Sequence, residues 1–195
     1  MPDHLVAEML GGDLVVSPRP GTPHTYTAGK IFRDLNSRFD GPGSGDGGGW
    51  WILFEPELHL GRDILVPDIA GWRHQRMPIF PNAAYVELAP DWVCEVASPS
   101  TARIDRAVKL AIYARERINH VWLVDALART LEVFRLENGR WVVAAVYSGN
   151  EVVSAEPFET MEIDLARWWH PGLGSLCGPY TRAYGMDLHA YVSGL

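Results

Sequence analysis

The sequence predicts an α/β domain with a mixed central sheet flanked by helices, plus a β-hairpin. Three observations favour this class. Short apolar runs typical of strands are interrupted by only two long helical patterns. The run at 120–125 is apolar almost throughout, as expected for a buried strand. The pair Asn138–Gly139 joins two strand patterns and is typical of a tight hairpin turn.

The predicted elements begin with a strand at 12–18 and a helix at 24–39, in which Ile31, Leu35 and Phe39 recur at helical spacing. This order is not a regular alternation of strands and helices, so the sheet should be mixed. The remaining strands are expected at 50–60, 64–73, 91–97 and 120–125, the second helix at 100–119, the hairpin strands in "LEVFRL" and "WVVAAVY", and a short helix within 156–169.

Two of these elements carry finer predictions. The strands at 50–60 and 64–73 should pair over a turn at Gly61–Asp63. In the second helix, Ser100 or Thr101 can cap the first turn. The stripe expected to pack on the sheet consists of Ile104, Ala107, Val108, Ala111 and Ile112.

Length and composition indicate a single domain over 1–195, with 170–195 as a C-terminal extension that has no assigned element. The formal net charge of -7 excludes a broadly basic surface, so a nucleic-acid site would have to be a local patch. Cys94 and Cys177 lack metal or disulfide spacing, which favours a reducing, cytoplasmic setting. Neither a signal-peptide pattern nor a membrane-length apolar run is present.

Two carboxylates stand inside strands that are otherwise apolar on both faces. Asp68 lies in "ILVPDIAGW" and Glu95 in "WVCEVA". An ionised carboxylate that is buried without a partner costs several kcal/mol. Each of these groups must therefore be protonated, paired with a cation or bound to a metal.

Glu57 is an additional candidate. If 50–60 pairs with 64–73 so that their apolar faces point the same way, Glu57 falls opposite Asp68. Two or three converging carboxylates supply hard oxygen ligands, which suit Mg²⁺ or Mn²⁺. Such an ion could hold a phosphate oxygen and lower the pKa of a bound water, which is the chemistry of phosphodiester hydrolysis.

Three segments together resemble a known family. They are "VPD" at 66–68, "CEVASPST" at 94–101 and "DRAVKLAIYARERINHVWLVD" at 105–125. In this combination they resemble the Uma-type family of putative restriction endonucleases, in the PD-(D/E)XK nuclease superfamily. The ends of the resemblance, "GDLVVSPRPGTPH" and "EIDLARWW", extend it over roughly 8–169.

The resemblance implies a restriction-endonuclease-like fold and metal-dependent cleavage of DNA. Asp68 matches the aspartate of "PD" and Glu95 matches the acidic residue of "(D/E)XK", so both would be metal ligands. Ala97 stands where the pattern has its lysine, and the resemblance implies that Lys109 in the following helix supplies it. There Lys109 would orient the attacking water or neutralise the phosphate.

Other interpretations remain open at this stage. Lys109 could form a surface ion pair with Asp105, four residues earlier. The glycine-rich segment 41–49 lacks the Lys-Ser or Lys-Thr of a phosphate loop. Ser98 and Ser100 lack the Gly-x-Ser-x-Gly elbow of a serine hydrolase. A glycosidase using two carboxylates has no supporting motif.

The alternative function is a catalytically inactive nuclease-like fold that acts as a dimeric binding module. The acidic net charge and Ala97 favour it. Trp168 and Trp169 suggest a contact in a homodimer, and His24 is interpreted as structural.

Overall fold

The computed structural model describes residues 5–40, 49–98 and 102–171. Within them a six-stranded mixed sheet has the order β10-β9-β8-β7-β6-β3. Its neighbours are antiparallel except for β7 and β8, which are parallel. The predicted mixed α/β architecture is therefore confirmed. The strands are β3 (Trp50–Phe54), β6 (Ile69–Arg73), β7 (Trp92–Ala97), β8 (His120–Asp125), β9 (Thr130–Glu137) and β10 (Arg140–Ser148).

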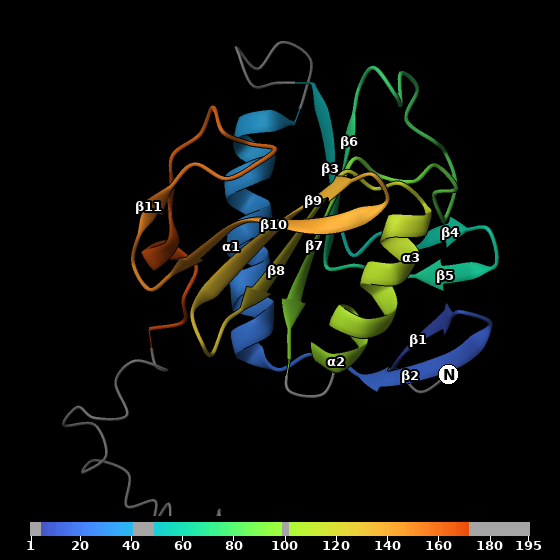
Figure 1. Cartoon of the computed structure of the whole chain (residues 1–195), viewed down its shortest axis with the longest axis horizontal. Helices are drawn as coiled ribbons and strands as arrows, with labels where there is room; N and C mark the ends of the chain where they lie inside the picture. The colour runs from blue at the N-terminus through green and yellow to red at the C-terminus, as the bar shows by residue number, and fades with distance from the viewer. Residues whose placement is uncertain (1–4, 41–48, 99–101, 172–195) are drawn as a thin grey trace, which may run out of the picture.

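A second, smaller sheet lies beside the central one (Figure 1). Among the described residues it has four strands in the order β2-β1-β5-β4. Its members are β1 (Leu5–Leu10), β2 (Asp13–Pro18), β4 (Leu58–Leu60) and β5 (Asp63–Leu65). β1 lies outside the predicted elements. A short pair, β11 (Val152–Val153) with β12 (Ile163–Asp164), precedes the 3₁₀ turn η3 (Leu165–Arg167) near the end of the described chain.

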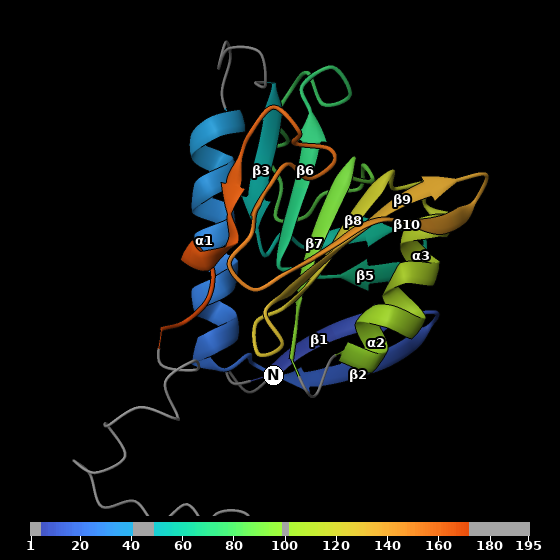
Figure 2. The same ribbon diagram turned by 60° about the vertical axis from the view of Figure 1, so that its left-hand side comes forward.

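Helices cover both faces of the central sheet (Figure 2). α1 (Thr22–Phe39) covers one face, and the second helix covers the other. This second helix runs through α2 (Ala102–Ile104), the π-helical turn η2 (Asp105–Lys109) and α3 (Leu110–Arg115). No helix in the described ranges has the length and apolar composition that a membrane span requires.

Each face of the sheet buries its own apolar cluster. In β7 the side chains of Trp92, Cys94 and Val96 belong to the cluster under α1, and Val93 belongs to the cluster under α3. This confirms the predicted alternation, which puts Glu95 on the same face as Val93. The site described below is therefore on the α3 face, next to the small sheet.

The predicted hairpin around residues 61–63 forms, but each of its arms is split between the two sheets. Leu58 pairs with Leu65 in the small sheet, and Phe54 pairs with Ile69 in the central sheet. Each break contains a proline, Pro56 or Pro67, which cannot donate a ladder hydrogen bond.

The expected register of Glu57 against Asp68 is wrong. It is Glu55 that lies beside Asp68, because its backbone N–H donates to the Asp68 carbonyl oxygen at 2.9 Å. Leu60 pairs with Asp63, so the turn has only two residues, and the register that it sets continues across the break to Phe54 and Ile69. Glu55 has a positive φ of 46°, so the chain turns sharply at the break.

The apolar stripe expected on the second helix is wrong at three of its five positions. Ala107, Val108 and Ala111 are exposed, whereas Ile112 is buried and Ile104 packs against the core as expected. The buried face also carries three side chains outside the predicted stripe, those of Asp105, Lys109 and Tyr113. The reason is the π-helical turn, in which the Leu110 N–H donates to the Asp105 carbonyl, so one extra residue rotates the pattern around the helix axis.

The expected dimer contact at Trp168 and Trp169 is wrong as well. Both side chains are buried in this chain's own core. The Trp168 indole N–H donates to the Asp34 carboxylate, and that of Trp169 donates to the Gly149 carbonyl. The proposed helix caps Ser100 and Thr101, and 41–48 of the glycine-rich segment, lie outside the described residues.

Gly71 in β6 should not tolerate a larger side chain. A Cβ there would lie 3.1 Å from Ile52 Cδ1 and 3.2 Å from the rings of Trp50 and Trp92, which are tightly buried. Gly71→Ala is expected to lower the free energy of unfolding by about 1–3 kcal/mol in urea denaturation. The control Gly29→Ala, on an exposed position of α1 with open space around it, should instead raise it by about 0.5–1 kcal/mol. A Gly71 variant as stable as the wild type would contradict this.

Candidate active site

The break between β5 and β6 presents Asp68. Its Oδ2 accepts a hydrogen bond from the backbone N–H of Val96 at 2.7 Å, which ties it to β7. The His24 Nε2, from the first turn of α1, lies 3.1 Å from Oδ1 and 3.2 Å from Oδ2. Only 13% of the Asp68 side chain is exposed. The aspartate is therefore held from two sides, by the central sheet and by α1.

Glu95 projects from the middle of β7, and only 4% of its side chain is exposed. Its Oε1 lies 3.2 Å from the Lys109 ammonium and accepts the Tyr113 hydroxyl. Burial raises the pKa of Glu95 well above its ordinary range; Lys109 opposes this shift, and the carboxylates of Asp105, Asp68 and Glu8 add to it.

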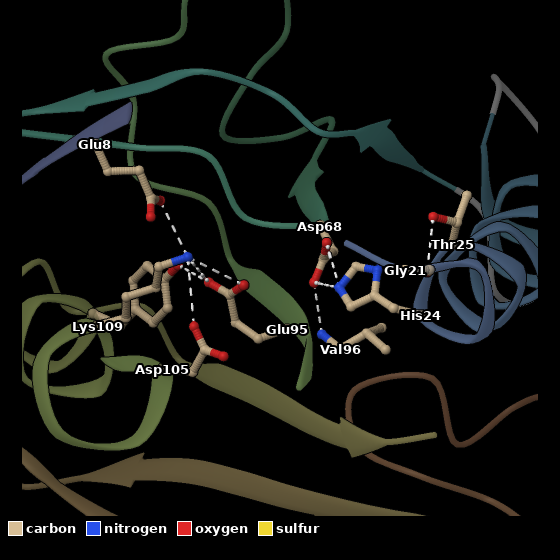
Figure 3. Close-up of polar contacts among 10 residues, drawn as sticks. Glu8, Gly21, His24, Thr25, Asp68, Glu95, Val96, Asp105 and Lys109 are labelled. Atoms are coloured by element: carbon tan, nitrogen blue, oxygen red, sulfur yellow. Dashed lines mark hydrogen bonds and ion pairs between the residues drawn. The ribbon is translucent and has the colours of Figure 1, made fainter. Parts of the chain in front are cut away.

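Lys109, in the π-helical turn, reaches back to the sheet as the sequence predicts. Its Nζ lies 3.1 Å from Glu8 Oε1, 3.2 Å from Glu95 Oε1 and 3.6 Å from Asp105 Oδ1 (Figure 3). Burial by itself lowers the pKa of Lys109, but the charges of Glu95, Glu8 and Asp105 outweigh it and raise the pKa above its ordinary value. The ammonium therefore stays protonated. The pair with Asp105 exists, but it is buried and is not the surface pair of the simpler interpretation.

Sequence reasoning missed Glu8, which the structure brings to the same place. It lies in β1, and 8% of its side chain is exposed. Besides Lys109, its Oε1 accepts the backbone N–H of Val66 at 2.8 Å. A signal was available: "LVAEML" is one more apolar run with a single carboxylate, like the runs around Asp68 and Glu95.

His24 was interpreted as structural, and it lies in contact with the aspartate. Its side chain is 10% exposed, and its Nδ1 is buried without a hydrogen-bond partner among the described residues. Among the described residues, Asp68 is thus the hydrogen-bonding partner of the ring. Within the described structure, the imidazole serves to orient that carboxylate.

These groups line one cavity of about 300 Å³. The described residues contribute more acidic than basic side chains to its wall. The acidic ones are Glu8, Glu55, Glu57, Asp68, Glu95 and Asp105, and the basic ones are Arg19, His24 and Lys109. Glu57 is at the rim, because 48% of its side chain is exposed and it pairs with His59 at 2.7 Å.

The innermost part of this cavity has an excess of negative charge. Three buried carboxylates, those of Glu8, Glu95 and Asp105, surround one buried ammonium, that of Lys109, in the described structure. If all four groups are ionised, together they carry a net charge of -2. Because net charge is costly to bury, this arrangement favours the uptake of protons or a cation.

The donor set suits a hard divalent ion. Asp68 and Glu95 face the same cavity with oxygen ligands. No three His, Cys, Asp or Glu side chains of the described ranges are grouped closely enough to hold a metal by themselves. Mg²⁺ does not need such a cage, since it commonly takes one or two carboxylates and completes its shell with water and phosphate oxygens.

Comparisons with known proteins bear on the family and the fold of this chain. The sequence profile of the Uma2 family, described as "Putative restriction endonuclease", matches residues 2–166. The crystal structure of "a putative nuclease belonging to DUF820" from Anabaena variabilis ATCC 29413 is similar, with 20% sequence identity, a TM-score of 0.66, and coverage of 84% of this chain and 89% of that chain. At this identity the likeness shows a common fold. A comparison with curated proteins gives no match.

Replacing the buried ammonium should destabilise the protein in a pH-dependent way. Lys109→Met leaves three buried carboxylates without their cation, which is expected to cost about 3–5 kcal/mol of unfolding free energy at pH 8. Lys109 opposes the rise in the pKa of Glu95, so without the ammonium this pKa rises further. The folded variant then binds a proton at Glu95 more readily than the unfolded chain does, and its stability recovers as the pH falls toward 5.

Urea denaturation at both pH values measures this effect. Lys30→Met is the matched control, because Lys30 is the only other lysine of the chain and lies over the Tyr26 ring on α1. It should change the unfolding free energy by less than about 1 kcal/mol. If Lys109→Met lowers the unfolding free energy equally at pH 5 and pH 8, the buried carboxylates do not depend on the charge of Lys109, and the prediction fails.

Proposed function

We propose, from the premise that this chain belongs to the Uma2 family, that it is a metal-dependent endonuclease that hydrolyses DNA phosphodiester bonds in the cavity between Asp68 and Glu95. The observation that carries the proposal is the buried cluster around Lys109, with its excess of negative charge beside Asp68. A fold that only needed stability would gain little from burying these groups.

In this proposal Asp68 and Glu95 hold Mg²⁺ or Mn²⁺. The ion would supply a Lewis acid for a phosphate oxygen and lower the pKa of a bound water. The Val96 N–H and His24 orient the Asp68 carboxylate. The Tyr113 hydroxyl and Lys109 do the same for Glu95.

Lys109 is the proposed cationic residue of the reaction. Its ammonium lines the cavity beside Glu95, in the place where a phosphate would meet the carboxylates. A fixed positive charge there would stabilise the negative charge that develops on the phosphate in the transition state. The exposed Glu57 at the rim is an additional candidate that can assist with water or metal.

Membership of this family supports a nucleic acid as the substrate, and we propose more specifically that the substrate is DNA. The net charge of -7 makes binding depend on a local site and on the metal, with little help from the overall field. We propose that the reaction takes place in the cytoplasm, because Cys94 is a free thiol and free thiols are typical of a reducing compartment.

A second candidate is the inactive nuclease-like fold that acts as a dimeric binding module. The observation that favours it is the same buried cluster, because the ammonium of Lys109 is already paired with carboxylates of this chain. The tryptophan pair does not support a dimer, because both rings are buried inside the chain. Metal binding and cleavage separate the two candidates.

Cleavage is tested by nicking of supercoiled plasmid DNA with Mg²⁺ or Mn²⁺. Asp68→Asn, Glu95→Gln and Lys109→Met should each lower the rate by about 10²-fold or more, because each removes a group that stabilises the transition state. Arg106→Gln, which disrupts only the surface pair with Glu132, serves as the control and should keep its rate within about threefold. Equal rates in all four variants would sink the proposal.

Metal binding is tested by isothermal calorimetry with Mn²⁺ on folded protein. Asp68→Asn and Glu95→Gln are expected to weaken the affinity at least about tenfold, since each removes a charged oxygen ligand. Glu57→Gln should change it less, because its carboxylate is exposed and paired with His59. An affinity that Asp68→Asn and Glu95→Gln leave unchanged would favour the binding module.

A further inference from the structure

We infer that Glu8, which lies in none of the nuclease motifs, is a positioning residue that holds Lys109 and the Asp68-bearing segment in one arrangement. The inference rests on the proposed function and adds a residue and a structural element to it. Glu8 belongs to β1 of the small sheet, whereas the motif residues come from β7, the second helix and the break before β6.

The first contact is with the backbone that leads to Asp68. Val66 is the first residue after β5, so its N–H lies beyond the paired residues of the small sheet. This N–H donates to Glu8 Oε1 at 2.8 Å. Two residues later the chain reaches Asp68, which is fixed in turn by the Val96 N–H at 2.7 Å. Glu8 therefore secures the beginning of the segment whose end carries the proposed metal ligand.

The second contact is with the proposed cationic residue. The same Oε1 of Glu8 lies 3.1 Å from Lys109 Nζ, the shortest of the three ion-pair distances around this ammonium. Glu8 is also the only partner among them that comes from outside the central sheet and its covering helix. The contact holds the ammonium close to β1 and restricts the flexible Lys109 side chain to one conformation.

The burial of both groups gives the contact its strength. Exposed fractions of the side chains are 7% for Lys109 and 8% for Glu8. A pair at the surface would be screened and weak, whereas the low exposure of this pair leaves water little room to compete. The side chain of Glu8 does not need to touch a substrate or a metal to act in this way, because it acts through Lys109 and through Val66.

A spectroscopic test reads Lys109 directly. The chain contains two lysines, so in a Lys30→Arg background the side-chain Cε of Lys109 gives a single lysine signal after ¹³C labelling. Glu8→Gln keeps the size and the acceptor oxygen for Val66 but removes the charge facing Lys109. The order parameter of this Cε should fall, because a clamped side chain becomes mobile.

The matched control is Glu132→Gln in the same background. Glu132 pairs with Arg106 of the same π-helical turn, at 2.6 Å, without contacting Lys109. It should leave the order parameter unchanged. The inference is overturned if Glu8→Gln leaves the Lys109 signal as it is in the control.

Activity supplies the second readout, measured on folded protein well below its melting temperature. Glu8→Gln should lower kcat of plasmid nicking about 10- to 100-fold, with KM and the Mn²⁺ affinity each within about threefold of the wild type. Glu8→Asp, which keeps the charge, should recover part of kcat. If Glu8→Gln leaves kcat unchanged, Glu8 has only a structural role. If Glu8→Gln lowers the Mn²⁺ affinity as much as Glu95→Gln does, Glu8 is a metal ligand. Either result overturns the inference.

These outcomes are separable from a failure of the proposed function. If the wild type nicks no DNA with Mg²⁺ or Mn²⁺, the nuclease proposal fails. The role of Glu8 in positioning Lys109 is then decided by the order parameter alone.

Discussion

One buried ammonium organises the candidate site. Lys109 brings together carboxylates from β1, β7 and its own π-helical turn. Without it, Glu8, Glu95 and Asp105 would repel one another in a region largely shielded from water. The packing of the small sheet, the central sheet and the second helix at this point is therefore tied to one ion-pair cluster.

Backbone irregularities bring these groups into contact. Pro56 and Pro67 end the ladder on both arms of the hairpin, so Asp68 leaves the sheet and turns toward α1 and β7. The π-helical turn places Lys109 on the buried face of the helix. Such turns inside α-helices are frequent at functional sites, because they place side chains where a regular helix cannot.

The opposite face of the sheet supplies rigidity. Trp92 and Trp122 pack edge to face at 5.1 Å, and Phe158 contacts Trp50, Trp92 and Trp122. The rings lie directly behind the strand that carries Glu95. A site built on closely packed strands keeps its groups in place more precisely than one built on loops, which suits charges that must meet a phosphate in fixed positions.

The sequence by itself determined the fold class, most of the elements, and the candidates Asp68 and Glu95, because apolar periodicity and misplaced carboxylates are local signals. The candidate Lys109 came from the resemblance of the motifs to a known family. The sequence did not determine the register of Glu57, the buried face of the second helix or the role of Glu8. The tertiary structure decided these, since a two-residue turn sets the strand register, a π-helical turn changes the helical period, and Glu8 meets Lys109 across 101 positions of the chain. Contacts between distant segments depend on how the sheets pack, and no local pattern encodes that.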